Sequence, residues 1–189
     1  MMTSDPNILA AGDCAEKVSF FTGKPVKVWL ASVATSEARI AAANLFEIRR
    51  ANKGAVSVFS TKIGGLSSGL AGIRERDARE AGIAYVVGEA EAPDKHPASL
   101  PGAARLRVKL VFRKYSGTLI GGQVCGGDTV GELVNLIAAM IQAEMSADQI
   151  ATFQMGTHPL LTASPVAYQV VNAAEIALAK MWESENGHH

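Results

Sequence analysis

The chain has 189 residues, 48% of them hydrophobic, and its 18 basic and 18 acidic side chains give a formal net charge of +0. This length supports a sizeable core, and no apolar run reaches the roughly 18 residues that a membrane span needs. The balanced charge provides no field for nucleic acid or an anionic membrane, so neither is expected as a partner. Two cysteines without a pairing motif, and no recognisable secretion signal, predict a cytoplasmic location.

The first motif lies near the N-terminus. The segment Asn7 to Ala11 contains an apolar run bounded by Pro6 and Gly12, which predicts a short buried strand. Asp13 follows at the position where open α/β sheets bind their ligands. Its two oxygens suit the hydroxyls of a sugar-like chain, and Gly12 permits close approach of a ligand to the backbone. The alternative is an ordinary aspartate turn without a ligand.

A long helix is predicted from Ala31 to Arg50, because the segment is rich in alanine and other good helix formers. The basic residues Arg49, Arg50 and Lys53 are interpreted as a solvated helix end and not as a binding patch. Lys53 and Gly54 end the helix and mark a domain boundary. The chain is thereby divided into residues 1–53, residues 54–183 and a tail of residues 184–189.

The residues after Gly54 favour a sheet. Between Arg105 and Lys114, apolar residues alternate with mostly charged ones, which is typical of a strand with one wet face. Tyr115 to Gly117 then predicts a hairpin turn, and the proline-rich stretch from Asp94 to Gly102 predicts a surface loop. The elements expected here are strands at Ala55–Ile63, Leu70–Arg74, Ile83–Glu89, Arg105–Lys114 and Thr118–Cys125, and a short helix at Glu75–Ala81.

Helical periodicity replaces the alternation from Asp128 onward. Residues Thr129 to Met145 carry an apolar stripe that must be buried. The capping box from Ser146 to Gln149 predicts a short helix towards Phe153, and Pro165 suits the first turn of a last helix ending near Trp182. Strands followed by helices predict an α+β fold, with two layers and an antiparallel sheet of about five strands packed by helices.

Two features are interpreted as structural. The glycine-rich run from Gly64 to Gly72 is predicted to be a flexible turn, because it lacks the Gly-Lys-Ser/Thr ending of a phosphate loop and leads into a strand. The four histidines form no metal-ligand pattern, and two of them, His188 and His189, end the chain after Gly187 as in the stub of an affinity tag.

Four segments share an order that is known from a group of flavoenzymes. They are the Thr3 to Asp13 motif ending in Ala-x-Gly-Asp, residues 28–45, residues 117–124 together with 136–145, and the pair His158-Pro159. Together they resemble the pyridine nucleotide-disulfide oxidoreductases, and most nearly their NADH oxidase and coenzyme A-disulfide reductase branch. The first two segments are similar to the last strand and helix of the FAD-binding domain, and the others to the C-terminal dimerisation domain.

Other parts of that family are missing from this sequence. It has no Gly-x-Gly-x-x-Gly turn for the FAD pyrophosphate, no second glycine-rich turn for the nicotinamide nucleotide and no cysteine beside such a turn. We therefore expect a C-terminal fragment of a larger enzyme. Residues 1–53 would be the remnant of the FAD-binding domain, and residues 54–183 the dimerisation domain. Cys14 is not expected to be catalytic, because the family's redox cysteine belongs to the missing part.

The resemblance implies roles for five residues near the N-terminus. It assigns Gly12 and Asp13 to the segment that binds the ribityl hydroxyls of FAD. It assigns the backbone groups of Leu30, Ala31 and Ser32, at a helix N-terminus, to the electron-rich edge of the flavin ring. FAD and NAD(P)H are thus the cofactors of the parent enzyme, while the fragment alone is expected to hold neither. The family also implies a homodimer.

His158 is the candidate catalytic residue. In disulfide reductases of this superfamily, a His-Pro segment of one subunit reaches the other subunit's active site, where the imidazole acts as acid and base with a glutamate five residues further on. Ala163 stands at that glutamate position here. The resemblance therefore favours a branch that handles oxygen or a small thiol or disulfide substrate, and a loop histidine without catalytic role is the alternative.

The predicted function follows from these points. The chain is expected to provide dimerisation and the last flavin-binding segment of an FAD-dependent NAD(P)H oxidoreductase, and to be inactive by itself. A stand-alone, non-enzymatic homodimerisation module is the alternative, and the length of the native open reading frame distinguishes the two.

Overall fold

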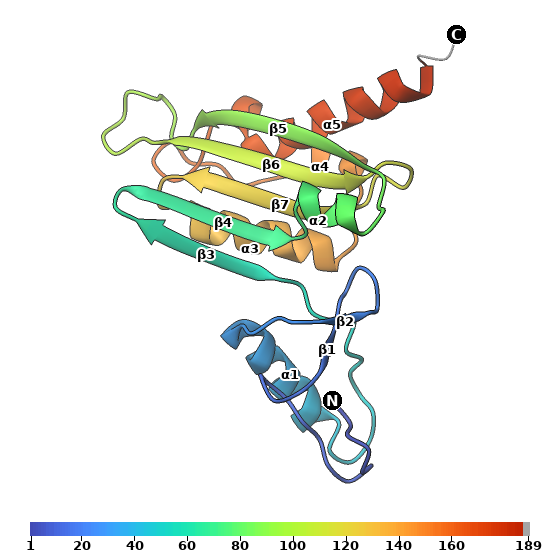
Figure 1. Cartoon of the computed structure of the whole chain (residues 1–189). Helices are drawn as coiled ribbons and strands as arrows, with labels where there is room; N and C mark the ends of the chain where they lie inside the picture. Colours follow the sequence, from blue (N-terminus) through green and yellow to red (C-terminus); the bar gives the residue numbers. More distant parts are fainter. Residues whose placement is uncertain (187–189) are drawn as a thin grey trace. The chain divides into compact units, whose positions relative to one another are not determined.

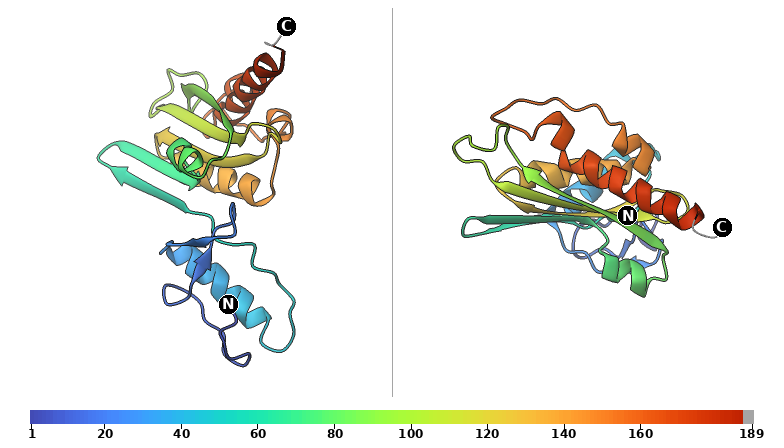
Figure 2. Two further views of the ribbon diagram at one scale, coloured as in Figure 1. Left: turned by 45° about the vertical axis from the view of Figure 1, so that its right-hand side comes forward. Right: turned by 90° about the horizontal axis from the view of Figure 1, so that it is seen from above.

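The computed structural model describes residues 1–186, which form two compact units. The first unit comprises Met1–Ser57, and the second begins at Val58. Figures 1 and 2 show the elements of each unit along the chain. The suggested tag residues Gly187, His188 and His189 lie outside the described residues.

The first unit contains one helix and a small sheet. Helix α1 (Ala31–Ala43) is accompanied by two antiparallel strands, β1 (Lys17–Val18) and β2 (Pro25–Val26). A parallel bridge between Ser19 and Ala55 brings the last residues of the unit beside β1. The sequence did not indicate β1 and β2, because strands of two residues carry no recognisable alternation.

The strand predicted at Asn7 to Ala11 is wrong. This segment instead folds back on the first residues of the chain, where Leu9 forms an isolated bridge with Met2 and Ala10 donates its N–H to the carbonyl of Met1. Ile8 is 54% exposed. A ladder needs a neighbouring strand of matching length, and no such strand lies beside this segment among the described residues.

The helix predicted from Ala31 to Arg50 ends at Ala43. Asn44 redirects the chain, because its Oδ1 accepts the backbone N–H groups of Arg49 and Arg50 at 2.9 Å, and its Nδ2 donates to the carbonyl of Arg50 at 2.8 Å. An asparagine side chain that bonds nearby backbone competes with helix propagation. The basic cluster is therefore on a loop beyond the helix and does not form its end.

The second unit is built on a five-stranded antiparallel sheet with the order β3-β4-β7-β6-β5. It confirms the predicted α+β fold, and each predicted strand of this unit is found with displaced ends. Residues 113–118 form the predicted hairpin turn, in which Gly117 donates to the carbonyl of Arg113. The strands are β3 (Val58–Ile63), β4 (Leu66–Gly72), β5 (Tyr85–Pro93), β6 (Arg105–Arg113) and β7 (Leu119–Gly126).

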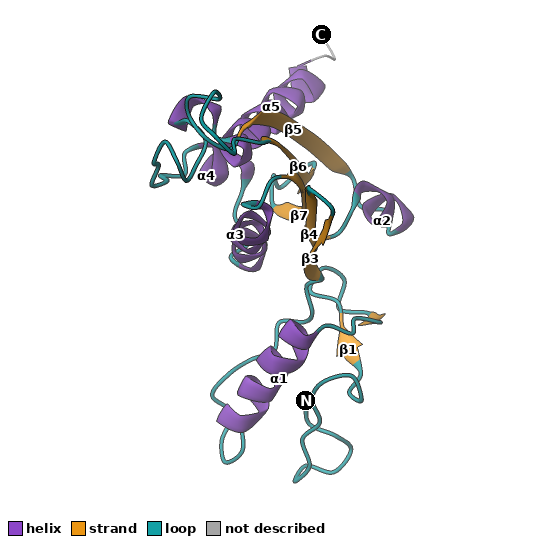
Figure 3. Ribbon diagram, turned by 90° about the vertical axis from the view of Figure 1, so that its left-hand side faces the viewer, coloured by secondary structure: helices purple, strands orange, loops and turns teal. Residues whose placement is uncertain are grey.

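The two faces of this sheet differ as the alternation in β6 predicts. Leu106, Val108, Leu110 and Phe112 are fully buried beneath helices. Between these positions, Arg105, Arg107 and Lys109 pair with acidic side chains of β5 and of helix α2 (Glu75–Glu80), namely Glu91, Glu89 and Glu75. Figure 3 shows α2 on the opposite side of the sheet from the other helices of the unit.

Three helices cover the buried face, namely α3 (Val130–Gln142), α4 (Ala147–Ala151) and α5 (Gln169–Asn186). The capping box of α4 is confirmed, since Ser146 and Gln149 each accept the other's backbone N–H. Two side chains of helix α5 bond it to carbonyls of β5. Gln169 Nε2 donates to the carbonyls of Ala92 and Pro93 at 3.0 and 3.2 Å, and Lys180 Nζ donates to that of Val87 at 2.8 Å.

Two further predictions need correction. The run Gly64 to Gly72 is not a flexible turn throughout, because only Gly64 and Gly65 turn the chain, and the rest is strand β4. The last helix does not run continuously from Pro165 to Trp182. Pro165–Ala167 forms a short 3-10 turn, and the extended backbone of Tyr168 separates it from α5. None of the described helices is long and apolar enough to cross a membrane.

Candidate functional site

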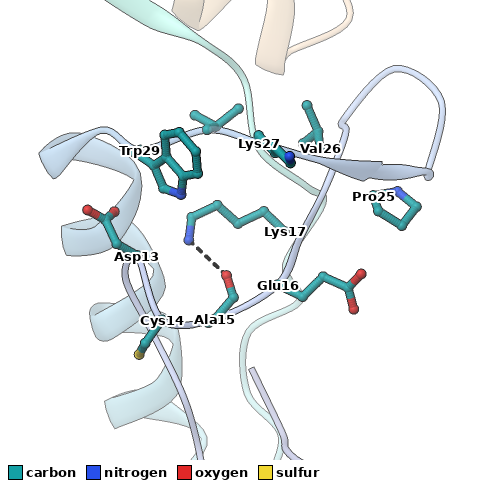
Figure 4. A pocket seen from close by; sticks show the side chains of 10 residues that line it. Asp13, Cys14, Ala15, Glu16, Lys17, Pro25, Val26, Lys27 and Trp29 are labelled. Carbon is teal, nitrogen blue, oxygen red and sulfur yellow. Dashed lines mark hydrogen bonds between the residues drawn. The ribbon is translucent and has the colours of Figure 1, made fainter.

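The Gly12-Asp13 motif borders a cavity of the first unit. The cavity has a volume of about 380 Å³ and is lined by residues 13–17 and 25–29. The first stretch ends in β1. The second begins with β2 and ends shortly before α1 (Figure 4). Of the residues that the resemblance assigns to flavin binding, Asp13 lines the cavity, whereas Leu30, Ala31 and Ser32 follow its last lining residue, Trp29.

Gly12 packs directly on α1. Its φ of +82° lies in the left-handed region, and a Cβ at this position would lie 3.6 Å from the Cβ of Ala34. The backbone N–H of Gly12 donates to Glu37 Oε2 at 2.9 Å. Glycine is suited to this turn because other residues adopt the conformation at a cost. These contacts place the turn against the first two turns of α1.

Lys17 crosses beneath the same turn. Its Nζ donates to the carbonyls of Gly12 and Ala15, at 2.5 and 3.2 Å, and lies 3.5 Å from Glu37 Oε2. Figure 4 shows the side chain extended below Trp29, with the bond to Ala15 drawn. The side chains of Lys17 and Glu37 are only 3% and 7% exposed. A buried, mutually paired lysine and glutamate therefore underlie the candidate site.

The start of α1 offers free donors. Leu30 has an extended backbone and makes no side-chain cap, and the first turn contains no acidic residue. The first N–H groups of a helix have no partner within it, so those of Ala31 and Ser32 can donate to an electron-rich group. Trp29, which lines the cavity just before this turn, is 67% exposed.

Asp13 and Cys14 stand at the rim of the cavity and are both exposed. The Sγ of Cys14 donates to the carbonyl of Ala11 at 3.4 Å, which orients the thiol along the turn. Within residues 1–186, no three histidine, cysteine, aspartate or glutamate side chains are grouped in a way that could hold a metal ion.

His158 belongs to the second unit. Its Nδ1 accepts the backbone N–H of Leu160 at 3.2 Å, and its carbonyl accepts those of Leu161 and Thr162 at 3.0 Å. The imidazole is exposed. With Nδ1 used as an acceptor, the neutral ring carries its proton on Nε2 and presents it to the outside.

Ala163 is only 4% exposed and lies in the interior of the second unit. It borders a cavity of about 30 Å³, together with Leu106 and Leu133. A carboxylate at this position would have to enter a mostly apolar pocket with room for about one water molecule. The packing around position 163 thus suits alanine and leaves little room for a glutamate that could pair with His158.

Three residues of the site were not predicted from the sequence. Lys17 and Glu37 meet across 20 positions of the chain, and Trp29 precedes the predicted helix. The one available signal was a glutamate within an alanine-rich helix, and Glu37 is the buried side chain of α1. From the sequence alone, such a glutamate is predicted to lie on the solvated face of its helix, because charged residues in helices are mostly exposed.

The chain is similar to several oxidoreductases. It is 29% identical over 181 residues to an NADH oxidase of Methanocaldococcus jannaschii, covering 96% of this chain and 40% of that protein. It is also 29% identical, over 150 residues, to the NAD(P)H sulfur oxidoreductase (CoA-dependent) of Pyrococcus furiosus, covering 79% of this chain and 34% of that protein. The chain therefore spans between a third and two fifths of the length of these relatives.

Solved structures share the fold. The NAD-dependent persulfide reductase from A. fulgidus matches 99% of this chain and 33% of its own, with a TM-score of 0.86 and 30% identity. The water-forming NADH oxidase from Lactobacillus brevis matches 97% of this chain and 40% of its own, with a TM-score of 0.87 and 24% identity, which supports the fold alone.

The sequence profile for the dimerisation domain of pyridine nucleotide-disulphide oxidoreductases matches residues 58–168, which is more than half of the chain. This range includes the five-stranded sheet together with α2, α3 and α4. The chain therefore belongs to the pyridine nucleotide-disulphide oxidoreductase dimerisation domain family.

Proposed function

We propose that the chain provides dimerisation and the last flavin-binding segment of an FAD-dependent NAD(P)H oxidoreductase that acts on oxygen or a small disulfide or thiol substrate. The relatives named as NADH oxidase and NAD(P)H sulfur oxidoreductase support this reading. In the proposal, residues 1–53 complete a flavin-binding domain and residues 54–183 form the dimerisation domain. The enzyme works in the cytoplasm.

The main observation behind this proposal is that the Gly12-Asp13 turn lies against helix α1, whose N-terminus has no side-chain cap. Gly12 bonds to Glu37 and lies close to Ala34, so the turn is held against the helix. An exposed carboxylate suits the ribityl hydroxyls of FAD, and the free N–H groups of Ala31 and Ser32 suit the electron-rich edge of the flavin ring. When bound, the flavin supplies the electron-transfer chemistry, and these residues supply its position and field.

His158 is proposed as an acid–base group that serves the active site of the partner subunit. Its exposed imidazole and its Nδ1 bond to the backbone of Leu160 leave Nε2 free to exchange a proton with substrate. Because Ala163 replaces the acidic partner, the imidazole would act without a carboxylate to hold its protonated form. This favours oxygen or a small thiol or disulfide as the acceptor.

Symmetric homodimerisation is proposed for the second unit, since its family is named for dimerisation. Light scattering should give a mass of about twice the 19.8 kDa of one chain. A single mass near 19.8 kDa at high concentration would contradict this. The alternative function, a stand-alone homodimerisation module, predicts the same dimer but no flavin partner.

Flavin binding separates the two functions. We expect the native open reading frame to encode a longer, yellow enzyme, in which Asp13→Ala weakens FAD binding at least tenfold while Asp148→Ala, a change on the exposed surface of α4, leaves it unchanged. A native frame that ends with these 189 residues would favour the stand-alone module. An Asp13→Ala enzyme with unchanged FAD affinity would contradict the proposed role of this segment in flavin binding.

A further inference from the structure

The ion pair beneath the candidate site does more than neutralise two buried charges. We propose that Lys17 and Glu37 are positioning residues, which hold the turn from Gly12 to Ala15, and thereby Asp13, in the form that receives the flavin. This inference rests on the proposed function and deepens it, because it names what fixes the geometry of the site.

The pair bonds to the turn from two sides. Glu37 Oε2 accepts the N–H of Gly12 at 2.9 Å, and Lys17 Nζ donates to the carbonyls of Gly12 and Ala15. Besides these, the backbone within the turn has one bond of its own, from the N–H of Ala15 to the carbonyl of Gly12 at 3.0 Å. The two side chains thus bond to three backbone groups of the turn, namely the N–H and the carbonyl of Gly12 and the carbonyl of Ala15.

The surroundings make the turn dependent on these bonds. The segment before it, Asn7 to Ala11, forms no strand, so no ladder fixes the position of Gly12 from that side. A buried charge without its partner is costly, and each charge here also has a backbone group to satisfy. Removing the ammonium of Lys17 leaves the Ala15 carbonyl without its donor and the Glu37 carboxylate without its opposite charge. The turn must then open to let water reach them.

Hydrogen exchange of the chain itself tests the positioning role. In Lys17→Met, we expect the amides of Gly12 and Ala15 to exchange at least tenfold faster, because opening of the turn exposes them. The amide of Asn44, at the far end of α1, should keep its rate. Lys17→Arg keeps the charge and the donors and should restore slow exchange.

The matched control is Lys24→Met, which removes an exposed lysine from the loop between β1 and β2. Its exchange rates should equal those of the unchanged chain. Should Lys17→Met not fold, Glu37→Gln takes its place. It replaces the bond from Gly12 to a carboxylate by a weaker bond to a neutral amide oxygen, so a smaller acceleration is expected at Gly12. Unchanged exchange at Gly12 and Ala15 would overturn the proposal. Equal acceleration throughout residues 1–57 would do so too, because it indicates a purely structural role.

Flavin binding by the complete flavoenzyme tests the consequence. Lys17→Met should raise the Kd for FAD about tenfold, and Lys17→Arg should restore the original Kd. The visible absorbance of the bound flavin measures both values. Asp13→Ala separates this inference from the function beneath it. If Asp13→Ala weakens FAD binding while Lys17→Met does not, the positioning role is wrong and the proposed function stands. If Asp13→Ala has no effect, the proposed function fails and this inference fails with it.

Discussion

His96 donates its backbone N–H to the carbonyl oxygen of Pro159 at 3.0 Å. This bond ties the loop between β5 and β6 to the loop that carries His158. Ala163, buried in the interior, fixes the same loop five residues further along. The exposed imidazole of His158 is therefore presented from a segment that is anchored at two points directly after it, Pro159 and Ala163.

Removing the imidazole tests this arrangement. In the complete flavoenzyme, His158→Ala should lower turnover with a small disulfide by about 10²-fold, which is typical for loss of a general acid or base. Stability should hardly change, because the side chain is exposed and bonds to one backbone N–H. Steady-state kinetics and a thermal melt measure the two effects. His96→Ala, another exposed histidine of this unit, is the matched control, and equal turnover in both variants would assign His158 to the loop alone.

Restoring the glutamate at position 163 should destabilise the protein instead of improving catalysis. Ala163→Glu forces a carboxylate into a small, mostly apolar pocket of about 30 Å³, and we expect a loss of about 2 to 4 kcal/mol in unfolding free energy. Urea denaturation measures it. Val166→Glu, at a position that is 87% exposed, should be nearly neutral. A variant as stable as the original chain would mean that the loop can open without cost.

Gly88 sets the distance between β5 and α5. A Cβ at this position would lie 1.7 Å from the carbonyl oxygen of Ala173, so the helix must move away in Gly88→Ala. We expect a loss of about 3 kcal/mol or more, at the upper end for overpacking. Gly65→Ala introduces the same methyl group where nothing lies within 4 Å and should leave the melting temperature nearly unchanged. Equal melting temperatures for the two variants would show that α5 adjusts freely.

Asp77 should contribute to the loss of stability in acid. Hydrogen bonds from Arg74 hold the pKa of the Asp77 carboxyl below its usual range. A lowered pKa in the folded state stabilises the protein above the unfolded-state pKa of about 3.9, and this contribution is lost as pH falls through the folded-state value. Because both side chains are partly exposed, the contribution should stay below about 1 kcal/mol.

Asp77→Asn is the matching variant. Its unfolding free energy should fall less steeply between about pH 5 and pH 2 than that of the unchanged chain. Glu80→Gln, which alters an exposed carboxylate of the same helix, should keep the original slope. Chemical denaturation at a series of pH values provides the measurement, and identical slopes for all three proteins would remove Asp77 from the acid response.

The sheet could be predicted because its information is local. Alternation in β6 and the apolar stripe of α3 depend on neighbouring residues alone, and both predictions are confirmed. The prediction of an N-terminal strand failed because an apolar run does not reveal whether a partner strand lies beside it. The predicted length of α1 was wrong because Asn44 bonds to backbone groups five and six residues away.

Only part of the candidate site could be predicted from the sequence. Gly12 and Asp13 belong to a short motif that can be read directly. The Lys17–Glu37 pair depends on a contact between residues 20 positions apart, and each partner alone resembles an ordinary surface charge. Burial of charge is decided by packing, which sequence periodicity does not report.

The attachment of α5 makes the two outer strands of the main sheet unequal. Lys180 and Gln169 occupy carbonyl oxygens of β5, so an incoming strand would have to displace them before it could pair there. On β3, Phe59 and Ile63 remain 49% and 77% exposed. Exposed apolar outer strands favour the addition of foreign strands, and a charge such as Lys62 discourages it. Self-association of partly unfolded chains should therefore begin at β3, and replacing Lys62 should promote it.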